Sequence, residues 1–173
     1  MPKILAGLEH ISDIGKSSRQ EQTEMNVIEV AHIWDSLLSR YIVLEETLIF
    51  QNFCQDKDLQ IVLNSGIKIL NRQIKILEKY IEHYAIVQPK RSPNIVKSTT
   101  NPEIISDEYI FRRIFAGMQA FIEVHARAFV QTPSPKLREQ FRKFLMEEIN
   151  IYDTMFEYGK LKNWISEPPA FRQ

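Results

Sequence analysis

The chain has 173 residues, of which 44% are apolar and 25% are charged, a size and balance that suit one domain with a stable core. Basic and acidic residues number 22 each, so the basic excess typical of nucleic-acid binders is absent. No apolar run approaches the roughly 20 residues that span a bilayer, and the start does not form a signal peptide. We therefore expect a cytoplasmic protein with no membrane partner and no nucleic-acid partner. Cys54 is the single cysteine, and we interpret it as an incidental thiol.

The first part of the chain predicts an arm followed by a helical hairpin. Residues 1–24 are polar and punctuated by glycine, and we interpret them as an N-terminal arm before a domain at 25–173. A first helix is expected from about 26 to 53, with Asn26 as its cap. A second is expected from about 58 to 87, because the residue before a proline disfavours helix.

The second part predicts another hairpin after a long link. Residues 88–106 contain three prolines and show no helical period. A third helix is expected from about 107 to 131, with Asp107 as its cap. The fourth is expected to begin at Ser134 and Pro135 and to reach about residue 164.

Each predicted helix carries one apolar arc when its residues are placed at 100° steps. Four such arcs can cover one another in an antiparallel four-helix bundle. The link of ~18 residues can span up to ~60 Å, which is enough to cross a bundle about 40 Å long. A simple up-down-up-down bundle does not need so long a link. We therefore predict an all-α, ferritin-like path with a crossover between the second and third helices.

Four polar residues are expected to face the apolar core. Glu45, His125 and Glu148 lie near the centres of three arcs, Gln73 lies just inside the fourth, and we expect no lysine or arginine near any centre. A buried carboxylate without a partner costs several kcal/mol, so these residues need compensation. One interpretation is a hydrogen-bonded network with core tyrosines. The other is a site for a divalent metal such as iron, manganese or zinc, at Glu45, His125 and Glu148, with Gln73 nearby.

Several patterns qualify the metal interpretation. A di-iron site needs inward Glu-x-x-His motifs on two helices, and the single such motif, Glu29 to His32, is expected on a solvated face together with Arg40. With a crossover, His125 is expected nearer one end of the bundle than Glu148. We therefore expect no oxygen-activating di-iron centre.

Two further patterns favour structural roles. Two glycines in the apolar arcs, Gly66 and Gly117, are expected to permit close helix contact. The basic stripe on the second helix is expected to form a solvated outer face, with an anionic partner as the alternative; it comprises Lys68, Arg72, Lys75 and Lys79.

The C-terminal half carries a family resemblance. The runs EVHARAFVQTPSPKLREQF and FLMEEINIYDTMFEYGKLKNWISEPPAF, with EVAHIWDSLLSRYIVLEETLIF and LNRQIKILEKY earlier, resemble an uncharacterised ferritin-like family of spore-forming bacteria related to the spore coat protein F group. The most specific piece is Tyr158-x-Lys160-x-Lys162-x-Trp164 followed by two prolines. The resemblance implies a ferritin-like bundle and a sporulation-associated lineage, with a histidine and a Glu-Glu pair at His125 and Glu147-Glu148.

We therefore expect a non-enzymatic structural or interaction protein, associated with the spore or its coat, that binds itself or another protein. The alternative is a metal-binding ferritin-like protein that uses Glu45, His125 and Glu148.

Overall fold

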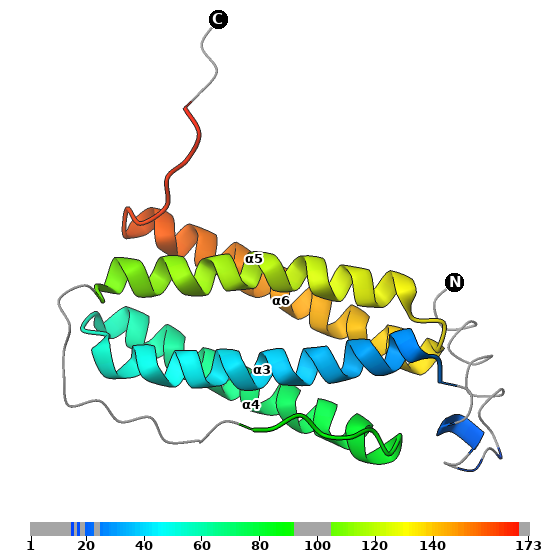
Figure 1. The fold of residues 1–173 in the computed structure, drawn as a ribbon. Coiled ribbons are helices and arrows are strands. Elements are labelled where there is room, and N and C mark those ends of the chain that lie inside the picture. Colours follow the sequence, from blue (N-terminus) through cyan, green and yellow to red (C-terminus); the bar gives the residue numbers. More distant parts are fainter. Residues whose placement is uncertain (1–14, 16, 18–19, 23–24, 92–104, 170–173) are drawn as a thin grey trace, which may run out of the picture.

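The computed structural model describes residues 15, 17, 20–22, 25–91 and 105–169. Most of the predicted arm and the middle of the long link, residues 92–104, lie outside the described residues. Four long helices dominate the described part: α3 Val27–Phe53, α4 Lys57–His83, α5 Asp107–Gln131 and α6 Pro135–Leu161 (Figure 1). The fold class is therefore all-α, as predicted, and the helices pack as a bundle.

Polar caps begin each helix. Asn26 accepts hydrogen bonds from the N–H groups of Ile28 and Glu29, and the Glu29 side chain returns to the Asn26 N–H, which completes a capping box. Ser134 caps α6 with Pro135 at its start, as predicted. The cap of α5 is Ser106 instead of the predicted Asp107.

Asp107 has a different role, which explains this shift. Its carboxylate accepts hydrogen bonds from the backbone N–H groups of Gln55 and Asp56, in the turn between α3 and α4. The side chain therefore ties the start of α5 to the far end of α3, and the neighbouring serine caps the helix.

Two helices end earlier than predicted because the chain turns through left-handed backbone. Ala85 has φ 51°, and the Ile86 N–H bonds to the Ile81 carbonyl, so α4 ends at His83 instead of residue 87. Asn163 has φ 58° and plays the same part after α6, which ends at Leu161 instead of about residue 164.

Contacts at the bundle ends set the directions of the helices. Glu29 at the start of α3 accepts a hydrogen bond from the Ser134 N–H, just after α5 ends. At the other end, Asp107 at the start of α5 holds the residues that follow α3. Hence α3 and α5 run in opposite directions, and the link between α4 and α5 begins and finishes at opposite ends of the bundle (Figure 1).

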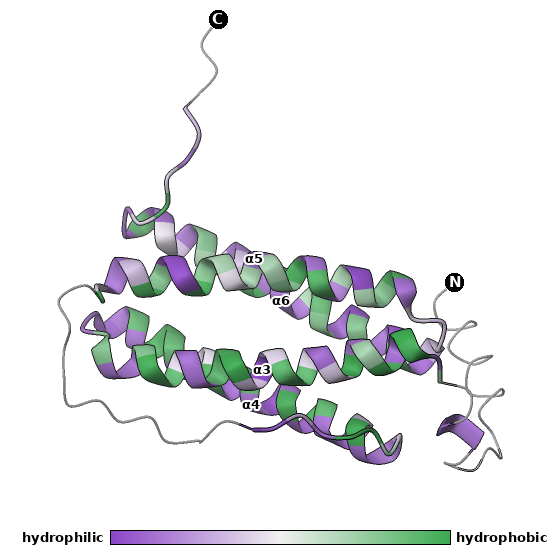
Figure 2. Cartoon of the chain, in the orientation of Figure 1, coloured by the Kyte–Doolittle hydropathy of each residue, from purple (hydrophilic) through white to green (hydrophobic). Residues whose placement is uncertain are grey.

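The helix surfaces alternate between apolar and polar residues along their length (Figure 2). The buried apolar side chains form two clusters, one around Leu37, Ile74 and Phe141 and one around Phe53, Leu59 and Ile110. Among the described residues, no helix has the length and apolar character needed to cross a membrane.

Helix α3 is buried on two faces, and this differs from the sequence interpretation. One face, with Tyr41, meets α4, where the tyrosine hydroxyl donates to Glu78 at 2.7 Å. The other face was expected to be solvated, yet Glu29, Ser36 and Arg40 on it are each only 2% exposed. The reason is position: α3 packs against both α4 and α5. A helix in that position has no broad solvated side.

Candidate functional site

A buried arginine lies at the centre of the polar cluster. Arg40 Nη2 donates to Glu148 Oε1 at 2.5 Å and to His125 Nε2 at 2.7 Å, and so joins α3 to α6 and α5. As whole residues, all three are 5% exposed or less. The Phe121 ring covers the guanidinium, with 3.9 Å between its centroid and Arg40 Cζ. The buried carboxylate is therefore compensated by an arginine on the facing helix, and not by the tyrosines expected from the sequence.

This contact also fixes the state of the histidine. A guanidinium has only donors, so His125 Nε2 must be the acceptor and the proton of the neutral ring lies on Nδ1. Burial, and secondarily the charge of Arg40, lowers the pKa of His125 to about 3. Burial likewise lowers the pKa of Arg40, while the charge and hydrogen bond of Glu148 act in the opposite direction. At neutral pH the cluster is an Arg–Glu ion pair with a neutral imidazole.

A second polar contact lies beside the first. Glu147 accepts a hydrogen bond from Gln73 Nε2 at 2.8 Å and pairs with Arg72, so it connects α6 to α4. Gln73 is fully buried, as the sequence predicted. Arg72, from the basic stripe, lies on the outer surface with 58% of its side chain exposed. The two neighbouring carboxylates therefore pair with different cations, Glu147 with Arg72 and Glu148 with Arg40.

The three residues predicted as metal ligands do not come together. His125 and Glu148 share Arg40 as a hydrogen-bond partner, so their polar side-chain atoms lie close together. Glu45 is partly exposed, and its place opposite Glu148 is taken by Arg40.

A divalent cation does not fit this arrangement. It would lie against the guanidinium that already binds both Glu148 and His125. In the part of the chain that the structure describes, no group of three or more His, Cys, Asp or Glu side chains is placed to hold a metal ion. The metal site at Glu45, His125 and Glu148 stays a prediction.

Arg40 was missed because the apolar arc of α3 was drawn from its large apolar residues alone. A second stripe repeats at alternating spacings of four and three residues, the spacing of buried positions along a packed helix. It comprises Glu29, Ile33, Ser36, Arg40, Val43, Thr47, Phe50 and Cys54. All but Val43, which is partly exposed, are buried. The heptad spacing was the signal that could have revealed Arg40.

Other candidate residues have structural roles. Cys54 is 6% exposed, and burial, with the nearby Asp107, raises the pKa of its thiol to about 12, so it is no nucleophile. In the Tyr-x-Lys-x-Lys-x-Trp motif, Lys162 bonds Asp56 at 2.7 Å, the cap of α4, and Trp164 packs on Phe111. This motif therefore closes one end of the bundle.

The fold and cluster define an all-α bundle protein whose buried polar groups largely pair with one another. The chain belongs to the family "Protein of unknown function (DUF3231)", which matches residues 13–173. Its fold is similar to the crystal structure of a "putative spore coat protein" from Bacillus halodurans C-125, with a TM-score of 0.79 and 18% identity. The match covers 86% of this chain and 96% of that one. No curated protein sequence matches the chain.

Proposed function

We propose that this chain is a non-enzymatic structural or interaction protein associated with the bacterial spore or its coat. The observation that carries the proposal is the fold similarity to the Bacillus halodurans protein, which extends over 96% of that chain. At 18% identity this likeness concerns the fold, so the role in the spore is our inference.

The polar cluster supports a non-enzymatic role. A catalytic acid or base must reach the substrate and exchange a proton near the working pH. His125 is fully buried with a pKa of about 3, and Glu148 is held by Arg40. These groups stabilise the contact of three helices and are not available for proton transfer.

A ferritin-like path is part of the proposal. It is supported by the opposite directions of α3 and α5, and by a link whose described ends lie at opposite ends of the bundle. The segment 86–91 runs back along the bundle, where Gln88 donates to the Tyr41 hydroxyl at 2.7 Å. Metal chemistry does not follow from this path. Elemental analysis of the purified protein tests the metal alternative: stoichiometric iron, manganese or zinc that is lost in Glu148→Ala would favour it.

Localisation during sporulation tests the main proposal. The full chain, fused to a fluorescent protein, is produced in a sporulating Bacillus host, with the fluorescent protein alone as the control. We expect a ring of fluorescence at the spore surface and recovery of the fusion in the coat extract of purified spores. A fusion that stays dispersed in the mother cell, as the control does, would contradict the proposal.

A further inference from the structure

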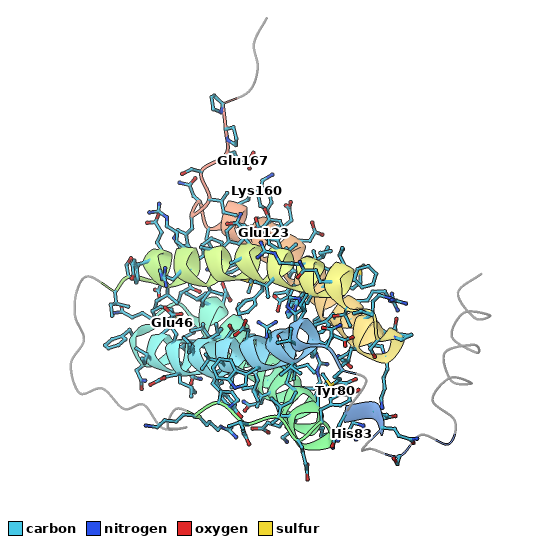
Figure 3. The ribbon with its side chains drawn as sticks, turned by 45° about the vertical axis from the view of Figure 1, so that its right-hand side comes forward. Glu46, Tyr80, His83, Glu123, Lys160 and Glu167 are labelled. Carbon is cyan, nitrogen blue, oxygen red and sulfur yellow. The ribbon has the colours of Figure 1, made fainter. Side chains whose placement is uncertain are left out.

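A large cavity runs along the inside of the bundle. It has a volume of about 780 Å³, and all four helices line it. Along α4 it extends from Ile61 to Gln73, which at 1.5 Å per residue is about 18 Å. The lining includes exposed apolar residues of α4 and α6, Ile61 at 66% and Met146 at 46%, so the cavity opens to solvent along these two helices. Glu46 on α3, labelled in Figure 3, forms an ion pair with Arg113 on α5, and both residues line the cavity.

Two glycines keep this space open. Gly66 on α4 and Gly117 on α5 both line the cavity, and a Cβ atom added to either would meet nothing within 4 Å. This corrects the prediction that they permit close helix contact. Glycine inside a helix is less favourable than alanine, and here it allows no tighter packing in return. At about 780 Å³ this space, which is open to solvent, has the size of a small-molecule binding cleft.

The end of the cavity at Gln73, here called the inner end, contains a hydrogen-bond acceptor without a partner. Gln73 is fully buried, lines the cavity, and has no hydrogen-bond partner for its Oε1 atom. Its orientation is determined by Glu147, because the amide N–H₂ group must face that carboxylate and the amide oxygen cannot. The Gln73 Oε1 atom therefore lacks a hydrogen-bond donor, which a bound molecule can supply.

The charges at this end are balanced. The charged groups near Gln73 are paired, Arg40 with Glu148 and Arg72 with Glu147. Arg142 and Lys143, which also line the cavity, both pair with Glu139. An anionic headgroup would add an uncompensated negative charge beside two carboxylates, and a cationic one would lie beside two guanidinium groups. A neutral donor such as a hydroxyl group meets the need of Gln73 without disturbing this balance.

We propose that this cavity binds an elongated aliphatic molecule with an uncharged hydroxyl headgroup, whose O–H donates to Gln73 Oε1 while the chain lies along the apolar walls between α4 and α6. The proposal is independent of any role in the spore.

Titration with straight-chain primary alcohols tests the proposal. Calorimetry on the full-length protein should show one molecule of 1-decanol bound per chain. Burial of each added methylene should tighten binding by up to about fourfold until the chain fills the cavity. Decanoate and decylammonium should bind at least about tenfold more weakly. Absence of decanol binding, or equal affinity for the three headgroups, would overturn the proposal.

Three variants locate the site. Gly117→Leu places a side chain inside the cavity and should abolish decanol binding, while the melting temperature is kept or raised. Ala116→Leu adds the same side chain on the exposed face of α5 and is the matched control, with unchanged binding. Gln73→Met should reduce the affinity for decanol about fivefold to tenfold and leave the dependence on chain length intact.

The same variants distinguish an alcohol bound in the cavity from an alcohol bound elsewhere and from a second copy of the chain. Unchanged decanol binding in Gly117→Leu would place the alcohol elsewhere and refute the site. If the wild-type protein binds no decanol and forms dimers that Gly117→Leu dissociates, the cavity is filled by a second copy of the chain, which also refutes the proposal. Sedimentation velocity on the wild type and both leucine variants supplies this readout.

Discussion

Replacement of Arg40 by methionine removes the cation that holds Glu148 in the core. The guanidinium and carboxylate are 2% and 6% exposed and 2.5 Å apart, so little solvent can replace either partner. Removal of one member of such a pair leaves a buried charge and costs about 3–5 kcal/mol. In a protein of this size each kcal/mol lowers the melting temperature by ~2–4 °C. We expect Arg40→Met to unfold some 6–20 °C below the wild type.

The double variant gives the sharper result. Glu148→Leu alone should destabilise the protein to a similar extent, because it leaves the Arg40 charge buried against a neutral imidazole. Arg40→Met combined with Glu148→Leu removes both charges and fills the space with apolar groups. Its free energy of unfolding should lie within about 1 kcal/mol of the wild type, or above it.

Urea unfolding followed by circular dichroism measures all three variants. Arg142→Met is the matched control, since Arg142 pairs with Glu139 on α6 but its side chain is 53% exposed, and we expect little change there. The reasoning is refuted if Arg40→Met is as mild as this control. It is equally refuted if the double variant loses the sum of the two single losses, because the buried charges would then be uncoupled.

Three further predictions concern single residues. The pKa of His125 is lowered from 6.5 to about 3, so between these values the unfolded chain binds a proton there that the folded chain does not. The free energy of unfolding should therefore fall from pH 6.5 toward pH 3 by at most ~1.4 kcal/mol per pH unit, and His125→Gln should reduce this slope in thermal melts. Gly159→Ala should destabilise the protein by about 1–3 kcal/mol, because the added Cβ would lie 2.3 Å from Phe111 Cζ. Gly117→Ala should stabilise it by about 0.5–1 kcal/mol, because the added Cβ would meet no atom within 4 Å; a loss of stability there would contradict the open cavity. Burial and a pKa of about 12 should make Cys54 react with a maleimide at pH 7 more than about 1000-fold slower in folded than in urea-unfolded protein, and equal rates would disprove its protection.

Much of the fold could be predicted from local patterns. Asn26 and Ser134 are caps that act on the N–H groups next to them, and the proline-containing link separates two helical hairpins. Helix ends were less accurate where the stop is a left-handed residue other than glycine, as at Ala85 and Asn163. Such a turn depends on what the following segment packs against, and the local pattern does not contain that information.

The polar site was only half predictable. His125, Glu148 and Gln73 were identified because each lies inside an apolar arc, and all three are buried. Arg40 and Glu29 were assigned to solvent because their neighbours on the helical wheel are polar. Their burial depends on α5 and α6, which belong to a later part of the chain.

The sequence by itself therefore determined which segments are helical, how α3 and α6 are capped, and that His125, Glu148 and Gln73 face inward and need partners. These properties depend on neighbouring residues along the chain, within a turn or two. Only the tertiary structure decided that α3 is covered on two faces, that Arg40 rather than Glu45 lies between Glu148 and His125, and that Gly66 and Gly117 border a cavity. Those outcomes depend on helix rotation and stagger, which arise from packing between segments far apart in the sequence.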